Sequence, residues 1–384
     1  MPTVALRTEQ DVDDLLRGLV LLGTGGGGHP RVGRRYLMRH VETGRPMQLT
    51  DLAEVPDDTW TCCVFGMGSV APHPPLSEAE RKQLGYVEDP LEYPMVEAVK
   101  ELEEYTGKDI QALVSFEPGA VATACPLDVA TRMNLLMVDA DYCGRAVPKL
   151  SQTMPALAGH TLWPAAICDS WGNRLLLKHA PSSEIAETLG KSISMVTKRP
   201  DAFAVCAHAG FLLPAHEVKR MAIRGTLSRA YTVGAAVRAA RDSNNDPVAA
   251  AAAALDGWVI FRGTIVGWEW ESRDGYMFGT NHIAGQARFA GHAMKIWFQN
   301  ENHIAWLDDS PYVTSPDLIM VVNAETGEPY VNTDLAEGLK VAVLGARAPT
   351  AYRTPGGLAA MGPAHYGYDI PYRRIETVLG SARE

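Results

Sequence analysis

The sequence predicts an α/β protein: an N-terminal α/β domain with a largely parallel sheet, followed by a C-terminal part that contains an antiparallel β barrel or sandwich. Over residues 1–165, apolar runs of strand length alternate with helical patterns, as in parallel sheets covered on both faces. Residues 258–349 instead alternate apolar and polar positions between Gly-rich turns, which is typical of antiparallel strands. A chain of 384 residues is too long to fold around one small hydrophobic core, which agrees with two parts.

The composition and net charge of the chain limit the kinds of molecule that it can bind. The chain is 46% hydrophobic and 21% charged, as expected of a globular protein, and its net charge of −10 argues against a nucleic-acid partner. No apolar run is long enough to span a membrane, and residues 1–16 do not resemble a signal peptide, so we expect a cytoplasmic protein. We also expect a homo-oligomer. The cysteines form no CxxC pair, which predicts buried free thiols at Cys62, Cys63, Cys125, Cys143, Cys168 and Cys206.

The first predicted element is a helix over residues 8–22, because leucines recur at helical spacing after Thr8, a residue suited to a helix N-terminus. Directly after it come Gly25, Gly26, Gly27, Gly28 and His29, which we assign to substrate binding. Consecutive glycines indicate a backbone that approaches a phosphate, a small substrate or the protein's own backbone closely. Because a dinucleotide fingerprint needs a strand before its glycines, and no GK[ST] follows, we expect no bound nucleotide.

Three later segments each predict a strand, at residues 59–72, 107–120 and 130–148. Glu117 follows the apolar run of the second segment, and Asp139 and Asp141 follow that of the third. In parallel sheets, ligands bind beyond the carboxyl ends of the strands. We therefore predict a site at these strand ends within a domain of residues 1–165. Residues 166–384 form the second predicted domain, with a helical segment at 182–256 and the β-rich unit at about 258–349.

Acidic side chains dominate this predicted site. We assign catalytic roles to Asp139, Asp141, Glu117 and Arg145, because carboxyls whose pKa values differ can perform acid–base chemistry. Their oxygen atoms could equally hold one divalent metal ion. Alternatively, Asp139 caps the following helix and Arg145 pairs with Asp141. Cys143 is assigned to substrate binding, with a buried inert thiol as the alternative.

The segments "LGTGGGGHP", "VDADYCGRAVP", "FQNENHIAW", "PDLIMVVNAETGEP" and "GPAHYGYD" occur together and in this order. In this the chain resembles the S-methyl-thiohydantoin desulfurase-like family, which is associated with hydantoinase and oxoprolinase systems. The resemblance extends from about residue 10 to about residue 372. It implies an α/β N-terminal domain, a C-terminal part with a β-barrel-like unit, and functional positions at Gly25–Gly28, Glu117, Asp139, Asp141, Gly144 and Arg145. The chain departs from the expected pattern at His29, Tyr142 and Cys143.

The resemblance also implies an activity, the hydrolytic removal of sulfur from a thiohydantoin-type ring. We therefore expect a hydrolase that acts on a cyclic amide or thioamide, with water activated by a carboxylate or a metal. Two alternatives from other classes stay open at this point. One is a non-catalytic subunit that docks on a hydantoinase-type partner through exposed aromatic residues of the β-rich region. The other is a nucleotide- or phosphate-binding module.

Overall fold

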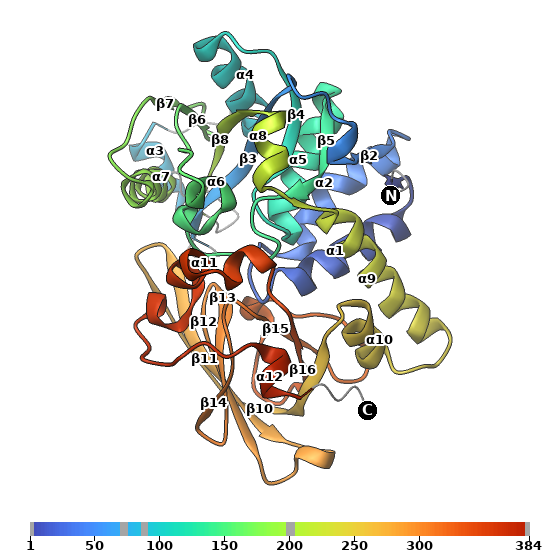
Figure 1. Cartoon of the computed structure of the whole chain (residues 1–384). Coiled ribbons are helices and arrows are strands. Elements are labelled where there is room, and N and C mark those ends of the chain that lie inside the picture. The colour runs from blue at the N-terminus through green and yellow to red at the C-terminus, as the bar shows by residue number, and fades with distance from the viewer. Residues whose placement is uncertain (1–3, 70–75, 86–90, 197–203, 381–384) are drawn as a thin grey trace.

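The computed structural model describes residues 4–69, 76–85, 91–196 and 204–380, so residues 70–72 of the first predicted strand segment lie outside it. Two sheets organise the chain (Figure 1). The strands of the first sheet are β1 (Val4–Leu6), β2 (Met47–Thr50), β3 (Trp60–Ser69), β4 (Ile110–Ser115), β5 (Leu136–Asp141), β6 (Ala165–Cys168), β7 (Arg174–Leu177), β8 (Ala204–Pro214) and β9 (Ile223–Arg224). Those of the second are β10 (Trp258–Arg273), β11 (Tyr276–Gly285), β12 (Ala293–Gln299), β13 (Glu301–Leu307), β14 (Ser310–Thr314), β15 (Leu318–Asn323) and β16 (Lys340–Ala346).

Helices cover both sheets. The α-helices are α1 (Glu9–Leu22), α2 (Pro30–Glu42), α3 (Glu78–Gln83), α4 (Pro94–Thr106), α5 (Ala120–Met133), α6 (Met154–Leu157), α7 (Ser183–Val196), α8 (Ala215–Met221), α9 (Thr226–Asp242), α10 (Pro247–Ala254), α11 (Pro355–Met361) and α12 (Ile375–Val378). The 3-10 turns are η1 (Leu52–Glu54), η2 (Leu150–Gln152), η3 (Ala287–Phe289), η4 (Asn332–Asp334), η5 (Thr350–Arg353) and η6 (Pro363–Tyr366). No helix in the described part of the chain is long and apolar enough to cross a bilayer.

The first sheet has the strand order β1-β2-β5-β4-β3-β8-β6-β7, and β9 pairs with β5. Its central strands β2, β5, β4 and β3 are parallel, and antiparallel strands flank them. Residues after position 165 supply β6 to β9, so this sheet draws strands from both sides of that position, and the predicted helical segment also contains β8 and β9. The carboxyl ends of β3, β4 and β5 meet at one edge, which confirms the reasoning that placed Glu117 and Asp141 near each other.

The second sheet is antiparallel throughout, with the order β14-β13-β12-β11-β10-β16-β15, and it curls into a half-barrel. Together the two sheets confirm the predicted fold class. In Figure 1 this sheet lies below the first, and α11 lies between them.

Alternation along the strands explains how the layers pack, because successive side chains point to opposite faces. On β15, Met320 and Val322 join the core around α1, whereas Ile319 and Val321 fill the half-barrel interior. Helix α1 is therefore packed against both sheets, and α9 lies beside it (Figure 1). Thr8 caps α1 as predicted, by accepting a hydrogen bond from the Asp11 N–H. The loop that leaves α1 consequently starts at the junction of the sheets.

Candidate functional site

The glycine loop packs against the protein's own chain. A Cβ on Gly26 would lie 1.9 Å from Oε1 of Glu301, and a Cβ on Gly27 would lie 2.6 Å from Cα of Gly119. Gly27 also has a φ of 73°, in the left-handed region that glycine tolerates best. Of the three predicted reasons for the glycine run, close approach to the protein's own atoms is the one that the contacts support. Binding of a substrate by Gly25–Gly28 stays a prediction.

Backbone hydrogen bonds hold this loop in place. The Gly27 carbonyl accepts from the N–H of Val121 at 2.9 Å, at the start of α5. The Thr24 carbonyl accepts from the Asn302 N–H on β13, and the Gly25 carbonyl accepts from the Asn332 N–H in η4. Because its carbonyls are engaged on several sides, the loop is fixed. The Gly27 N–H donates to the Glu301 carboxyl.

Glu117 follows β4 and is buried. Its Oε2 accepts a hydrogen bond from the Val147 N–H at 2.8 Å. Burial raises the pKa of Glu117 well above its usual range, and the nearby carboxyl of Glu301 raises it further. A raised pKa favours the protonated form of this carboxyl, which suits a general acid.

Glu301 begins β13 and is only 3% exposed. Burial raises its pKa to about 8, while Arg145, Lys191 and the Gly27 N–H favour its ionised form. Within the described residues, its Oε2 has no hydrogen-bond partner. The sequence did not assign Glu301 to the site. The usable signal was the polar run "QNENH" inside an otherwise apolar strand pattern, because polar residues on a covered strand must face a polar interior.

Asp141 ends β5 and is fully buried. Its Oδ1 accepts hydrogen bonds of 2.5 Å from the N–H groups of Cys143 and Gly144, which shapes the turn that follows. Burial raises the pKa of Asp141 to about 7, against the effect of these hydrogen bonds. Since its charge also raises the pKa of Glu117, the three carboxyls of Glu117, Asp141 and Glu301 form one electrostatic group, called the carboxyl cluster below.

Asp139 lies at the N-terminus of α9 and not against the glycine loop. Its Oδ1 accepts hydrogen bonds from the Leu227 N–H at 3.1 Å and the Ser228 N–H at 3.0 Å. A carboxylate there satisfies helix N–H groups that have no partner within the helix and interacts favourably with the helix dipole. These contacts match the capping alternative considered for this residue, although the helix is not the one next in the chain.

Arg145 is fully buried and bonded to the protein itself. Its Nη1 donates to the carbonyls of Pro316 and Asp317, and its Nη2 donates to Thr24 Oγ1 and the Asn302 carbonyl, all at 3.0–3.1 Å. Burial lowers its pKa, and the charge of Glu301 acts in the opposite direction. Its guanidinium therefore supplies positive charge to the carboxyl cluster and ties the glycine loop to the second sheet. It does not pair with Asp141 through a hydrogen bond.

The two remaining predicted residues have structural contacts. Cys143 is buried, and burial together with the nearby Asp141 raises its pKa well above the usual value, which keeps it a thiol. His29 is the N-cap of α2, where its Nδ1 accepts from the Arg31 N–H, and its Nε2 lies 3.0 Å from Asp334 Oδ2. All six cysteines are free and buried, as predicted.

His303 is a second residue that the sequence did not single out as part of the site. It is fully buried on β13, and its Nδ1 lies 2.7 Å from Ser315 Oγ. Its ring stacks on that of Tyr366, with centroids 4.0 Å apart. Its Nε2 has no hydrogen-bond partner of good geometry among the residues that the structure places, although the Gln299 carbonyl lies close enough to the ring to favour its charged form.

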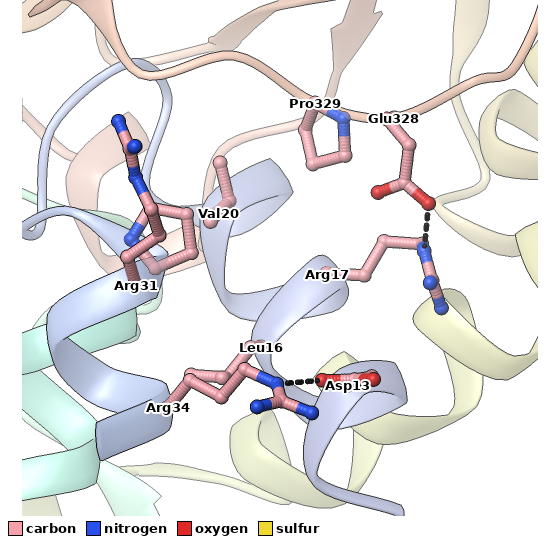
Figure 2. Close-up of a pocket in the computed structure, with 9 residues that line it drawn as sticks. Asp13, Leu16, Arg17, Val20, Arg31, Arg34, Glu328 and Pro329 are labelled. Atoms are coloured by element: carbon pink, nitrogen blue, oxygen red, sulfur yellow. Dashed lines mark hydrogen bonds and ion pairs between the residues drawn. The ribbon is translucent and has the colours of Figure 1, made fainter. Parts of the chain in front are cut away.

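An open pocket of about 220 Å³ lies elsewhere, between α1, α2 and the loop after β15 (Figure 2). Four of its five charged residues are paired, Arg17 with Glu328 at 2.8 Å and Arg34 with Asp13 at 2.8 Å, and the fifth, Arg31, lies 3.3 Å from His29 Nε2. It contains no member of the carboxyl cluster. Across residues 4–69, 76–85, 91–196 and 204–380, no group of three or more His, Cys, Asp or Glu side chains could hold a metal ion.

Comparisons with known proteins agree with this architecture. A family model described as the S-Me-THD-like N-terminal domain matches residues 10–179, and one described as the S-Me-THD-like C-terminal domain matches residues 183–375. The chain is similar to the crystal structure of a protein from Chromobacterium violaceum, with a TM-score of 0.74 and 23% sequence identity, over 97% of this chain and 100% of that one. This likeness shows a shared fold. No curated protein matches the chain significantly.

Proposed function

This chain belongs to the S-Me-THD-like family, and on that premise we propose that it is a hydrolase that removes sulfur, or a sulfur-bearing group, from a cyclic thioamide ring of the thiohydantoin type. One observation supports this most: two buried carboxyls, Glu117 and Glu301, interact beneath the glycine loop, and one oxygen of Glu301 has no hydrogen-bond partner within the described part of the chain. Paired carboxyls in a dry site hold their protons unequally, which provides an acid and a base together.

In the proposed reaction, Glu301 is the base. With a pKa of about 8 it is ionised only in part at neutral pH, and Arg145 and Lys191 favour that ionised form. Its Oε2 takes a proton from water, and the water oxygen forms a bond to the ring carbon that carries sulfur. Glu117 gives its proton to the leaving sulfur as the C–S bond breaks. The second proton of the water passes from the new hydroxyl group to sulfur, or to the ring nitrogen of an S-methylated ring, so that the hydroxyl becomes the ring carbonyl. The proton held by Glu301 then restores Glu117. The products are the ring carbonyl and hydrogen sulfide, or methanethiol from an S-methylated ring.

The other predicted catalytic residues position this pair. Asp141 orders the turn at Cys143 and Gly144, and Asp139 fixes α9 against β5. Arg145 contributes charge from behind Glu301, because its N–H groups already bind protein oxygens. The described residues do not gather a metal-binding donor set, so the scheme routes no step through a metal ion.

The test is an assay of the purified chain on a panel of thiohydantoins and S-methyl-thiohydantoins, with sulfide and methanethiol as the readouts. We expect Glu301→Gln and Glu117→Gln each to lower kcat by about 10²- to 10⁴-fold, the usual contribution of general acid–base catalysis. Glu328→Gln is the matched control, since Glu328 lies in the open pocket of Figure 2 and should keep full turnover. Full turnover by Glu301→Gln would contradict the mechanism.

A second candidate function is supported by a different region. Val266 and Trp270 on β10 are large apolar side chains that stay 57% and 40% exposed. Exposed residues of this kind suit a subunit that docks on a hydantoinase-type partner. Co-purification with such a partner that is lost in Trp270→Ser, together with no sulfide release by the chain alone, would favour this function over hydrolysis.

A further inference from the structure

The proposed reaction places negative charge on the exocyclic atom of the ring, and that atom needs a hydrogen-bond donor. Arg145 is the cation expected to serve, but protein oxygens accept from Nε, Nη1 and Nη2. Lys191 Nζ pairs with Glu187 Oε1. The donors that remain are buried polar atoms near Glu301 that lack a partner. His303 Nε2 is such an atom, on a side chain with no exposed surface.

A β-bulge gives His303 its orientation. Between β12 and β13, Trp297 pairs with Ile304 and Phe298 pairs with Asn302, so His303 is the extra residue of β13. Bulges bend a strand and turn one side chain out of the regular alternation, and they are frequent beside active sites. Here the bulged residue contacts Ser315 and Tyr366, which come from outside β13.

His303 and Glu301 share neighbouring side chains. Asn302 lies between them, and its carbonyl accepts from Arg145, whose charge acts on both neighbouring side chains. Tyr366 stacks on the His303 ring, and the charge of Glu301 acts on its phenol. Both unpartnered atoms, Glu301 Oε2 and His303 Nε2, therefore belong to one buried region beside Arg145 and Tyr366.

We propose that His303 donates its Nε2–H to the exocyclic oxygen or sulfur of an uncharged five-membered ring, with Ser315 fixing the tautomer by donating its hydroxyl hydrogen to Nδ1. The inference rests on the proposed function, because the ring carbon that His303 polarises is the one that water attacks from Glu301. Burial and the charge of Arg145 lower the pKa of His303, so the imidazole is neutral at physiological pH. A neutral N–H stabilises a developing anion without the desolvation cost of a second buried cation.

The experiment uses the full chain with ¹⁵N-labelled histidine and hydantoin, a ring without sulfur to release. We expect the His303 signals of the free protein to show the Nε2–H tautomer, and hydantoin to shift the Nε2 resonance. In Ser315→Ala, the two tautomers should both be populated. A free-protein spectrum with the proton on Nδ1, or no response to saturating hydantoin, would overturn the inference.

Two substitutions separate the ring nitrogens. His303→Asn keeps an atom that can reach Ser315 but removes the donor at the Nε2 position, and we expect at least a tenfold loss in hydantoin affinity. His303→Gln keeps an N–H near that position and should retain most of the affinity. The control is His40→Asn, which alters a buried histidine of α2 paired with Asp128 of α5 and should bind hydantoin normally.

The outcomes distinguish this inference from the proposed function. If wild type releases sulfide and His303→Asn matches it in hydantoin affinity and kcat/KM, the inference fails and hydrolysis stands. If hydantoin shifts the Nε2 signal and His303→Asn loses affinity while no thiohydantoin is turned over, the donor role stands and the proposed hydrolysis fails. Should His303→Asn not fold, the tautomer ratio in Ser315→Ala decides the donor role.

Discussion

The carboxyl cluster at the junction of the sheets and the open pocket between α1 and α2 both combine acidic side chains with arginine, but they differ in what those side chains contact. In the pocket, Glu328 is 41% exposed and pairs with Arg17. In the cluster, Glu301 is 3% exposed, and one of its oxygens lacks a partner among the described residues.

This contrast indicates that the carboxyl cluster is better suited to chemistry than the open pocket. The paired charges of the pocket already use most of their hydrogen-bonding groups. A buried carboxyl oxygen without a partner lost its hydrogen bonds to water on folding, so it can still accept a hydrogen bond from a ligand. Unsatisfied groups are therefore the better guide in this molecule than the shape of the surface. Three substitutions test how far the distinction holds.

The largest effect is expected at the closed site itself, from Gly26→Ala. The added methyl would meet Glu301 Oε1, so the loop or the carboxyl must move. We expect a loss of about 1–3 kcal/mol in the free energy of unfolding and at least a tenfold loss of sulfide release. The control is Gly356→Ala in α11, where nothing lies within 4 Å of the new Cβ. Equal effects of the two substitutions would show that the loop's contact with Glu301 is unimportant.

The second effect concerns stability alone, as a function of pH. The pKa of Glu301 is about 8 in the folded protein and near 4.5 when unfolded, so its contribution to stability is complete below pH 4.5 and is lost as the pH rises through 8. Glu301→Gln lacks this loss. We therefore expect the free energy of unfolding of the variant, relative to that of wild type, to rise by on the order of 3 kcal/mol between pH 5 and pH 9.

Denaturant unfolding at a series of pH values measures this difference. Some pH dependence should persist in Glu301→Gln, because the raised pKa of Asp141, about 7, has the same sign. Glu328→Gln in the open pocket should show no such gain on wild type. A constant difference between wild type and Glu301→Gln from pH 5 to pH 9 would mean that Glu301 is not held in a dry environment.

The smallest effect is expected from Asp139→Asn, because asparagine caps helices about as well as aspartate. Unfolding free energy should change by less than about 0.5 kcal/mol, and sulfide release should stay within threefold of wild type. Asp139→Ala removes the acceptor for Leu227 and Ser228 and should cost about 1 kcal/mol. Loss of turnover in Asp139→Asn with unchanged stability would mean that Asp139 takes part in the reaction itself.

Local pattern predicted much of this structure. The leucine spacing after Thr8 identified α1 to its ends, and the rule that parallel strands present their carboxyl ends together brought Glu117 and Asp141 into one neighbourhood. The resemblance to the family is confirmed by the matches to both of its domains. These predictions succeeded because each depends on residues close in sequence or on one sheet.

What sequence could not predict depends on contacts between distant segments. Glu301 reaches the site because the second sheet packs under the end of α1, more than 270 residues earlier in the chain. Asp139 and Asp141 are two residues apart, yet Asp139 accepts from N–H groups of α9, whereas Asp141 accepts from the turn at Cys143 as well as from Thr226 of α9. His303 is aimed by a bulge that leaves no mark in the polar and apolar pattern.

The bonds of Arg145 have a consequence for how a ring could enter. The guanidinium donates hydrogen bonds to the loop after α1, to β13 and to the segment at Pro316. A hinge motion between the two sheets would have to break all of these hydrogen bonds together. Tyr366 is held as well, at its hydroxyl by the Gln152 amide and at its ring by His303 and Trp297. We therefore expect a bound ring to leave the Arg145 hydrogen bonds intact.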